Sequence, residues 1–456
     1  MIESIRRIFA IPELRVKIFY TLILLGVCRL GAYISVPGVN ADIAVSLFQY
    51  ATGGGQNLFQ LVDIFSGGAF AKMTVFALGV MPYIQASIVL QLLIALVPSM
   101  QREIRESPDQ GRRKLSRWTR FATLIFALLQ SAFFTSYVVG VNRSSPGVVV
   151  PEMIDVQIFG FSWLFYLTVM FTMTAGSLVL MWIGEQISEK GVGNGISLII
   201  SLGILSSFPS TIGAIIQQLN LGSQEVGQIT FATLIVLCAL FILITVGTIL
   251  VIQGQRKIPL QYARRIVGRH ETQGGTSHIP LKVNYAGVIP VIFASSFLMF
   301  PAMIGQLMGR GTWLGQLSNY LSPGSWVYMF LYVMLILFFT YFWTSTQFKP
   351  EQIASDMKKN GAFIPGIRQG KPTQDFLQTT MSRITLSGAI FLAIIAILPT
   401  LVGRFMGVDA SISQFFGGTS LLILVGVILD TTKQIESHLL MKRYEGFMTK
   451  GRLRGR

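Results

Sequence analysis

Charged residues are scarce in this chain: they make up 12% of its 456 residues, whereas about a quarter is usual in a soluble domain. Histidine occurs three times and cysteine twice. So few charges cannot cover a water-soluble globule of this length, and two cysteines cannot form a disulfide framework. Apolar residues make up 52% even without the 45 glycines, which excludes an intrinsically disordered chain. The composition predicts a polytopic membrane protein.

Signatures of catalytic and metal sites are missing as well. The sequence contains neither an H-E-x-x-H zinc motif nor a G-x-x-x-x-G-K-[ST] phosphate loop, and its histidines lack the spacing of metal ligands. Cys28 and Cys238 lie in apolar stretches and are expected to pack as small hydrophobic side chains. The glycine-rich run at 191–195 follows no predicted strand, so a turn between two spans is a better interpretation than a nucleotide loop. We expect no enzymatic chemistry, no cofactor and no metal.

Long apolar runs dominate what is present. A helix needs about 20 residues to cross a membrane, and ten stretches reach that length. Pro209 interrupts the fifth of them, and glycines precede it. Residues 1–16 have the pattern of an amphipathic helix that lies on the membrane surface. The predicted spans cover residues 17–37, 73–97, 118–139, 159–183, 193–213, 230–252, 287–307, 326–347, 384–403 and 418–438.

The loops give the orientation, because they hold most of the 36 lysines and arginines on one side. The opposite side carries only Lys72, Arg143, Arg310 and Arg404. The positive-inside rule therefore places both termini and the large loops in the cytoplasm, which requires an even number of spans. Ten spans form an N-terminal half at 17–213 and an inverted C-terminal half at 214–438, followed by a basic cytoplasmic tail at 439–456. Inverted halves of this kind hold their working site at the interface near the membrane midplane.

The spans contain almost no titratable groups. Glu185 and Asp430 lie towards cytoplasmic ends, and Arg29 is the one deep charge. Since coupling ions need ligands inside the membrane, ion-coupled transport is disfavoured. A small-solute transporter with an inverted repeat and an inert membrane scaffold or insertase without a through-pore both stay open.

Residues 57–70 form a short apolar helix pattern on the outer side, ended by Gly67 and Gly68. The segment is too short to cross the membrane. Two placements are open: a re-entrant segment surrounded by protein, or an interfacial helix on the outer leaflet.

The cytoplasmic loops at 254–286 and 347–383 are too long to be simple connections. Both are basic and contain glycine-marked turns. Their charge is explained either by the positive-inside rule alone or by the docking of an acidic or RNA-bearing partner.

Seven specific motifs are spread along the chain: FSGGA at 65–69, ALGVMPYIQASIVLQLL at 77–93, GRRKLSRWTR at 111–120, MWIGEQISEKGVGNGIS at 181–197, IPLKVNYAGVIPVIFASS at 279–296, GAFIPGIRQG at 361–370 and GGTSLLILVGVILD at 417–430. In this order they resemble the motifs of the SecY family of bacterial protein-translocation channels.

The resemblance implies an all-α clamshell of two inverted five-helix halves around an hourglass pore, hinged between spans five and six. It also implies a ring of aliphatic side chains at the narrow point of the pore. The matching positions are Val80, Ile84, Ile196, Ile200, Ile292 and Ile423. Val80 stands where the family often has isoleucine. Without the resemblance, each of these residues would be interpreted as helix-packing core.

The same resemblance implies that segment 57–70 is the plug that closes the outer funnel, with Gly67 and Gly68 as its hinge. The matching apolar plug residues are Leu58, Phe59, Leu61, Ile64 and Phe65. Spans two and three against seven and eight correspond to the lateral gate through which signal sequences reach lipid. Polar gate positions match Gln91, Gln130, Ser295 and Ser296. These polar side chains, the glutamine amides above all, would hold the gate shut or make ordinary interhelical contacts.

The two long loops resemble the docking surface for the ribosome and for the motor ATPase SecA. The matching basic residues are Arg256, Lys257, Arg264, Arg265 and Arg368. The tip of the first loop departs from the family at Arg269-His270-Glu271. The resemblance also implies the partner subunits SecE and SecG, a location in the bacterial inner membrane, and a passive channel for unfolded secretory chains.

Overall fold

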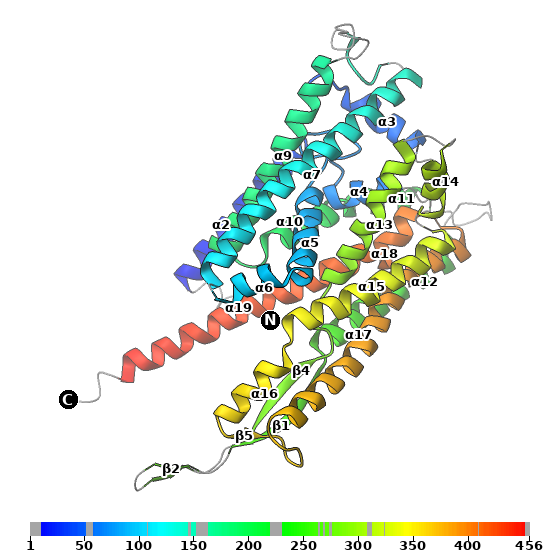
Figure 1. Cartoon of the computed structure of the whole chain (residues 1–456). Helices are drawn as coiled ribbons and strands as arrows, with labels where there is room; N and C mark the ends of the chain where they lie inside the picture. Colours follow the sequence, from blue (N-terminus) through cyan, green and yellow to red (C-terminus); the bar gives the residue numbers. More distant parts are fainter. Residues whose placement is uncertain are drawn as a thin grey trace.

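The computed structural model shows a chain built almost entirely of helices (Figure 1). It describes residues 11–51, 58–106, 108–144, 147–151, 163–218, 230–262, 265–267, 270–272, 276–307, 312–322, 324–408 and 410–451. The first part contains α2 Pro12–Gly31, α3 Ala41–Ala51, α4 Leu58–Ser66, α5 Met81–Leu96, α6 Pro98–Glu106, α7 Pro108–Ser144, α9 Trp163–Lys190, α10 Gly195–Ser206 and α11 Phe208–Gln218.

The second part contains helices and a small β region. The helices are α12 Phe231–Gln253, α13 Ile289–Leu307, α14 Trp313–Tyr320, α15 Trp326–Gln347, α16 Pro350–Lys359, α17 Lys371–Met406, α18 Ala410–Gly417 and α19 Thr419–Gly451. The strands are β1 Gln255–Tyr262, β2 Arg265–Val267, β3 His270–Thr272, β4 Thr276–Lys282 and β5 Ala362–Phe363.

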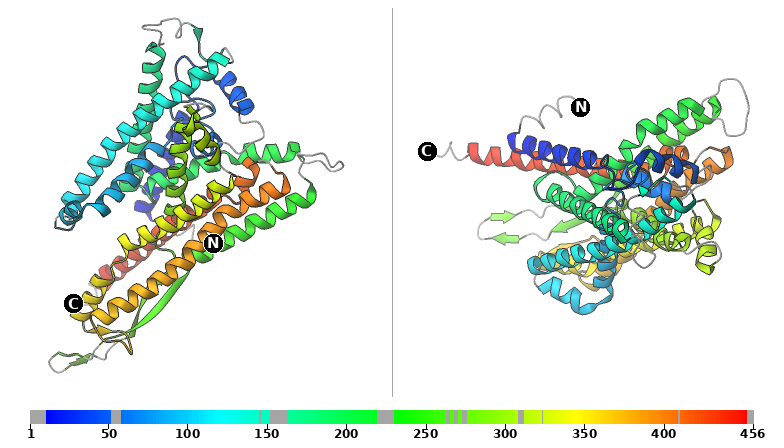
Figure 2. Two further views of the ribbon diagram at one scale, coloured as in Figure 1. Left: turned by 45° about the vertical axis from the view of Figure 1, so that its right-hand side comes forward. Right: turned by 90° about the horizontal axis from the view of Figure 1, so that it is seen from above.

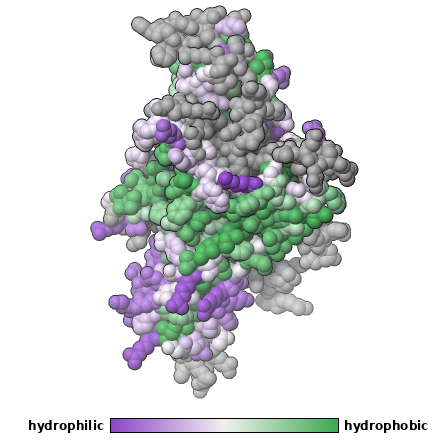
Figure 3. All heavy atoms as spheres, turned by 90° about the vertical axis from the view of Figure 1, so that its right-hand side faces the viewer, coloured by the Kyte–Doolittle hydropathy of each residue, from purple (hydrophilic) through white to green (hydrophobic). Residues whose placement is uncertain are grey.

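Each predicted span overlaps a helix of the structure. Among the residues that the structure describes, six helical stretches are suited to crossing a membrane by length and composition: Asp109–Gly140, Trp163–Lys190, Gly195–Gln217, Phe231–Gln253, Trp326–Lys359 and Lys371–Met406. Met81–Leu96 and Ile289–Met299 are shorter apolar helices. Figure 3 shows a broad apolar band across one face, with hydrophilic residues gathered below it. The chain is a multi-pass membrane protein.

The helix of the second predicted span is shorter than expected. The pattern over 73–97 predicted one continuous helix, but α5 begins only at Met81. The preceding stretch turns repeatedly because Gly67, Gly68, Gly79 and Met73 have positive φ. A right-handed helix cannot include such residues.

Three helices extend across boundaries that the sequence predicted. Residues 12–16, assigned to a surface helix, form the first turns of α2, and residues 1–10 lie outside the described part. α11 crosses the predicted boundary between the halves at 213–214. α19 continues past the predicted end of span ten as one straight helix that projects from the molecule (Figure 1).

Two groups of helices diverge from each other, as Figure 2 shows most clearly. α2, α5, α7, α9 and α10 form the first group, and α12, α13, α15 and α17 the second. α19 packs against α10 and α12, while α13 packs against α5 and α7 on another side of the interface. The main hydrophobic core runs through this interface and includes buried residues of both groups.

A second, smaller core lies in the region of β1, β4, β5 and α16, which we call the strand lobe. β1 pairs antiparallel with β4 and also with β5, so that residues far apart in sequence share one sheet. Ile258 and Leu260 alternate with exposed residues along β1 and pack against Leu281, Ile364 and Leu377. This alternation is typical of a strand with one buried face.

Candidate functional site

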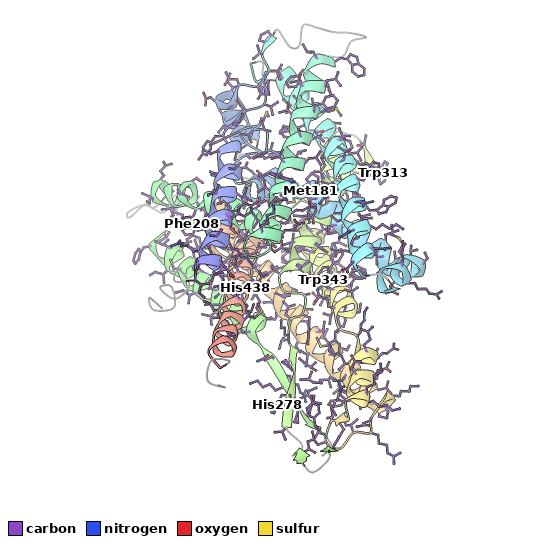
Figure 4. All side chains as sticks on the ribbon, turned by 90° about the vertical axis from the view of Figure 1, so that its left-hand side faces the viewer. Met181, Phe208, His278, Trp313, Trp343 and His438 are labelled. Atoms are coloured by element: carbon purple, nitrogen blue, oxygen red, sulfur yellow. The ribbon has the colours of Figure 1, made fainter. Side chains whose placement is uncertain are left out.

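A cavity of about 460 Å³ lies where the two groups of helices meet. Its walls come from α5, α7, α9, α10, α13 and α15. In Figure 4, Trp343 of α15 lies in the middle of the molecule, well away from His278 in the strand lobe. Among the predicted ring residues, the cavity is lined by Ile84, Ile196, Ile200 and Ile292.

Polar and charged side chains line this cavity as well. Ile84 lies near the start of α5, and Gln91 lies about 10 Å further along the same helix at 1.5 Å per residue. Arg120 of α7 pairs with Glu185 of α9 at 2.7 Å, and both residues line the cavity. The remaining polar lining residues are Tyr83, Ser87, Ser116, Ser188, Glu189, Asn194 and Ser197. The cavity therefore combines aliphatic side chains with a charged pair and several hydroxyl and amide groups.

The other two predicted ring residues do not line this cavity. Val80, the residue before α5, is buried and lines a separate small cavity beside Phe65 and Gly203. Ile423 of α19 is fully buried. Val80, Ile423 and the four residues above all belong to the main hydrophobic cluster or pack directly against it. Four of the six predicted ring residues thus line one cavity, and the other two lie in the same core.

The predicted plug forms α4, and α4 packs against α10 and α13 rather than standing free. Val62 and Phe65 are buried, and Ile64 is partly buried against the main core. This packing favours a re-entrant segment over a helix on the outer leaflet. The side chains of Leu58, Phe59 and Leu61 lie outside the described residues. Gly67 and Gly68 follow α4 with φ of +69° and +83°.

Asp63 fixes the end of α4 to the turn that follows it. Its carboxylate accepts a hydrogen bond from the Ala71 N–H at 2.8 Å. Burial raises the pKa of the Asp63 carboxyl to about 6, although this hydrogen bond and the nearby Lys72 charge oppose the rise. Asp63 and the rest of α4 lie between the first two predicted spans, outside both.

The predicted gate residues make different contacts. Gln130 of α7 donates to the Gln85 amide oxygen of α5, and Gln91 donates to Ser87 on its own helix at 3.0 Å. Both amides thus bond within the first group of helices. Ser295 donates to the Ile292 carbonyl of its own helix. Ser296 is the predicted gate residue that reaches across, to the sulfur of Met81.

The predicted docking residues that the structure describes lie in the strand lobe or in segments connected to it. Arg256 and Lys257 are exposed on β1. Arg368 is exposed in the turn between β5 and α17, and its carbonyl accepts a hydrogen bond from Thr373 at 2.8 Å. Arg265 lies on β2 with its side chain outside the description, and Arg264 is outside it altogether. Because β1 pairs with β5, the sheet holds both long loops together.

Sequence reasoning did not identify several residues of this site. Gln85 is the buried partner of Gln130, and a glutamine inside the apolar run at 77–93 was the available signal. The Arg120–Glu185 pair had no such signal, because its members are 65 residues apart. The strands of the loops could have been found from the alternating Ile258 and Leu260.

Comparisons with known proteins agree with this geometry. The family model described as SecY matches residues 74–432. Protein translocase subunit SecY of Chlamydia trachomatis is 60% identical over 99% of both chains. The protein of the same name from Thermotoga maritima is 40% identical over the full length of both.

Solved structures share the fold. One described as "The structure of a protein conducting channel" aligns with a TM-score of 0.62 at 20% identity, over 92% of this chain and 91% of that one. The canine Sec61 in a ribosome–channel complex from the endoplasmic reticulum aligns with a TM-score of 0.58 at 17% identity, over the same shares. At these identities, the structural likeness establishes the clamshell of ten helices.

Proposed function

This chain belongs to the SecY family, and we propose from that premise that it passes unfolded secretory polypeptides through a pore between its two halves and releases apolar segments sideways into lipid. It is the pore-forming subunit of a protein translocase. The observation that carries the proposal is a cavity between the two groups of helices that is lined by aliphatic side chains of α5, α10 and α13. The halves are residues 17–213 and 214–438, with the tail at 439–456.

The six aliphatic residues form the constriction: Val80, Ile84, Ile196, Ile200, Ile292 and Ile423. A narrow collar without hydrogen-bonding groups excludes water and ions. It also offers no specific contact to a translocating chain, so it yields to many sequences. The slightly smaller Val80 lies directly beside α4, which supports the closure of the outer side by that helix.

α4 and the turn after it act as the plug, at residues 57–70. Its buried contacts with α10 and α13 support this role. α10 belongs to the first group of helices and α13 to the second, so α4 rests on both halves. Separation of the halves would then remove the contacts of α4 with α13.

The lateral gate runs along α5 and α7 on one side and α13 and α15 on the other. The contacts of α13 with α5 and α7 support a closed seam. Phe293 of α13 packs edge-on against Trp343 of α15, with ring centroids 5.8 Å apart, and this pair forms part of the second half's wall of the cavity. An apolar signal helix would replace the contacts of α13 with α5 and α7 by its own.

The strand lobe and the turn at Arg368 dock cytoplasmic partners. Exposed arginine and lysine suit the phosphates of ribosomal RNA and acidic protein surfaces. The canine relative is described in a ribosome–channel complex. The ribosome and SecA bind here in our proposal and supply the energy, and the docking residues are Arg256, Lys257, Arg264, Arg265 and Arg368.

The remaining assignments follow from the family and from the charge distribution. The channel works with SecE and SecG in the bacterial inner membrane. Both termini face the cytoplasm, because the basic loops and the basic tail lie on that side.

Ion leak through the reconstituted channel tests the pore assignment. Ile84→Ala enlarges the constriction and should raise the leak of the idle channel severalfold. Ile88→Ala is the matched control, because Ile88 is buried one turn further along α5 and does not line the cavity. A leak that is equal for both variants would contradict the pore. Crosslinking of a stalled secretory chain to position 84, with no crosslink to position 88, would support it independently.

A further inference from the structure

Arg29 is the one deep charge of the predicted spans, and the pore assignment gives it no role. It lies in the last turn of α2 and is half-buried. Its Nη1 donates a hydrogen bond to the Gly67 carbonyl oxygen at 2.8 Å. Gly67 directly follows α4, so the guanidinium is bonded to the C-terminal end of this short helix.

The position of the Gly67 carbonyl is tightly defined. A Cβ added to Gly67 would lie 2.9 Å from the Gly203 Cα and 2.6 Å from the Ser206 Oγ of α10. A Cβ added to Gly203 would lie 2.6 Å from the Phe65 carbonyl oxygen. Only two glycines allow these backbones to approach so closely. Ser206 Oγ also donates to the Gly67 carbonyl at 3.2 Å.

The bond to Arg29 is stronger than an ordinary backbone contact. A cation at a helix C-terminus interacts favourably with the helix dipole, and a hydrogen bond from an ionised donor is about twice as strong as a neutral one. Tyr33 holds the guanidinium in place: its hydroxyl accepts from Nη2 at 3.3 Å, and its ring lies 5.0 Å from the guanidinium carbon. Lys72 lies over the same ring at 4.7 Å.

We propose that Arg29 is a positioning residue for the plug: its hydrogen bond to the Gly67 carbonyl holds α4 in its seat and keeps the idle channel closed. The proposal rests on the proposed role of α4 as the plug. α2 and α10 belong to the same half, so this bond fixes the plug to the first half. The contacts of α4 with α13 can then be lost when the halves separate, while the end at Gly67 stays tethered.

Idle-channel leak in proteoliposomes, with the full chain and the subunits that co-purify with it, tests the proposal. Loss of one charge-assisted hydrogen bond should raise the open fraction, and hence the leak of Arg29→Ala, by about ten- to a hundredfold. Arg29→Lys keeps the charge and should restore part of the seal. Arg15→Ala removes an exposed cation from the same helix and should behave as wild type.

A chain lacking residues 58–66 separates this proposal from the proposed function. If Arg29 acts through the plug, Arg29→Ala adds no leak in the deleted chain. An equal increase in intact and deleted chains would show a structural role and overturn the proposal, as would a tight Arg29→Ala channel. If the deletion itself caused no leak, the plug assignment would fail, and the proposal with it.

Accessibility of the plug gives a second measurement. In a chain with Cys28→Ala, Cys238→Ala and Val62→Cys, the thiol at this buried position should react slowly with a membrane-impermeant maleimide. Arg29→Ala should raise that labelling rate by the same factor as the leak. Unchanged labelling alongside raised leak would show that the ions pass by another route, and the proposal would be wrong.

Discussion

Ser296 of α13 donates its hydroxyl hydrogen to the sulfur of Met81 at the start of α5, with 3.9 Å between the two heavy atoms. Both residues are buried, and their helices belong to opposite halves of the channel. The bond itself is weak, since a thioether sulfur is a poor acceptor. Its importance is positional, because it marks a point where the proposed lateral gate is closed.

A crosslink at this point should therefore lock the gate. In a chain without Cys28 and Cys238, we expect oxidation of Met81→Cys with Ser296→Cys to stop export and membrane insertion, and a reductant to restore both. The readout is translocation of a secretory substrate into vesicles. Met81→Cys with Ser295→Cys is the matched control, because Ser295 bonds to its own helix. Equal inhibition by both pairs, or full export by a crosslinked Met81–Ser296 pair, would contradict a gate here.

The buried amide pair should contribute to stability rather than to gating. Gln130→Leu leaves the buried Gln85 oxygen without its donor, so we expect a loss of about 1–3 kcal/mol in the free energy of unfolding. Gln85→Leu with Gln130→Leu removes both polar groups and should recover most of that loss. Thermal unfolding of the purified complex measures both changes. A double variant no more stable than Gln130→Leu would show that the pair is not coupled as the geometry implies.

These contacts show where sequence reasoning ends. Gln130 was recognisable as a polar residue in a predicted gate span, and Gln85 as a glutamine in an apolar run. Nothing in the sequence pairs the two, because α5 and α7 meet only in the folded chain. The same holds for Arg29 and Gly67, which are 38 residues apart. The sequence marked Arg29 as an unusual charge and Gly67 as a hinge without linking them.

The helices were easier to predict than the strand lobe. Apolar runs of about 20 residues predict spans directly, because the membrane imposes the length. The pairing of Gln261 with Phe363 joins two loops about a hundred residues apart, and such long-range pairing leaves no periodic signal. The helical prediction for the second span failed at 73–80 because Met73 and Gly79 have positive φ, and a non-glycine residue such as Met73 carries no local signal of that backbone conformation.

Arg368 offers a test of the docking surface. Its side chain is exposed, and its turn is held in place by the buried Ile364 and by the hydrogen bond from Thr373 to the Arg368 carbonyl. We expect Arg368→Glu to reduce SecA-driven export at least tenfold, because the charge reversal repels an acidic partner without disturbing the core. Lys359→Glu, an exposed charge reversal on the neighbouring α16, should leave most of the export rate intact. Wild-type export by Arg368→Glu would refute the assignment.

The seated plug, with α4 packed as in this structure, should become more stable at low pH because of Asp63. Burial raises the pKa of this carboxyl to about 6, whereas a released plug in water would have the ordinary pKa of 3.8. The seated state therefore binds a proton more tightly, so its advantage is full below about pH 4 and is lost as the pH rises through 6. Between pH 7.5 and pH 5 the seating equilibrium should shift by about tenfold, and idle-channel leak should fall accordingly.

Asp63→Asn is the control, because its side chain keeps an oxygen that can accept the Ala71 N–H but cannot titrate. The leak of this variant should not change over this pH range. If the leak of wild type and of Asp63→Asn changed equally with pH, another group would be responsible, and a wild-type leak that rose on acidification would show that the proton favours release.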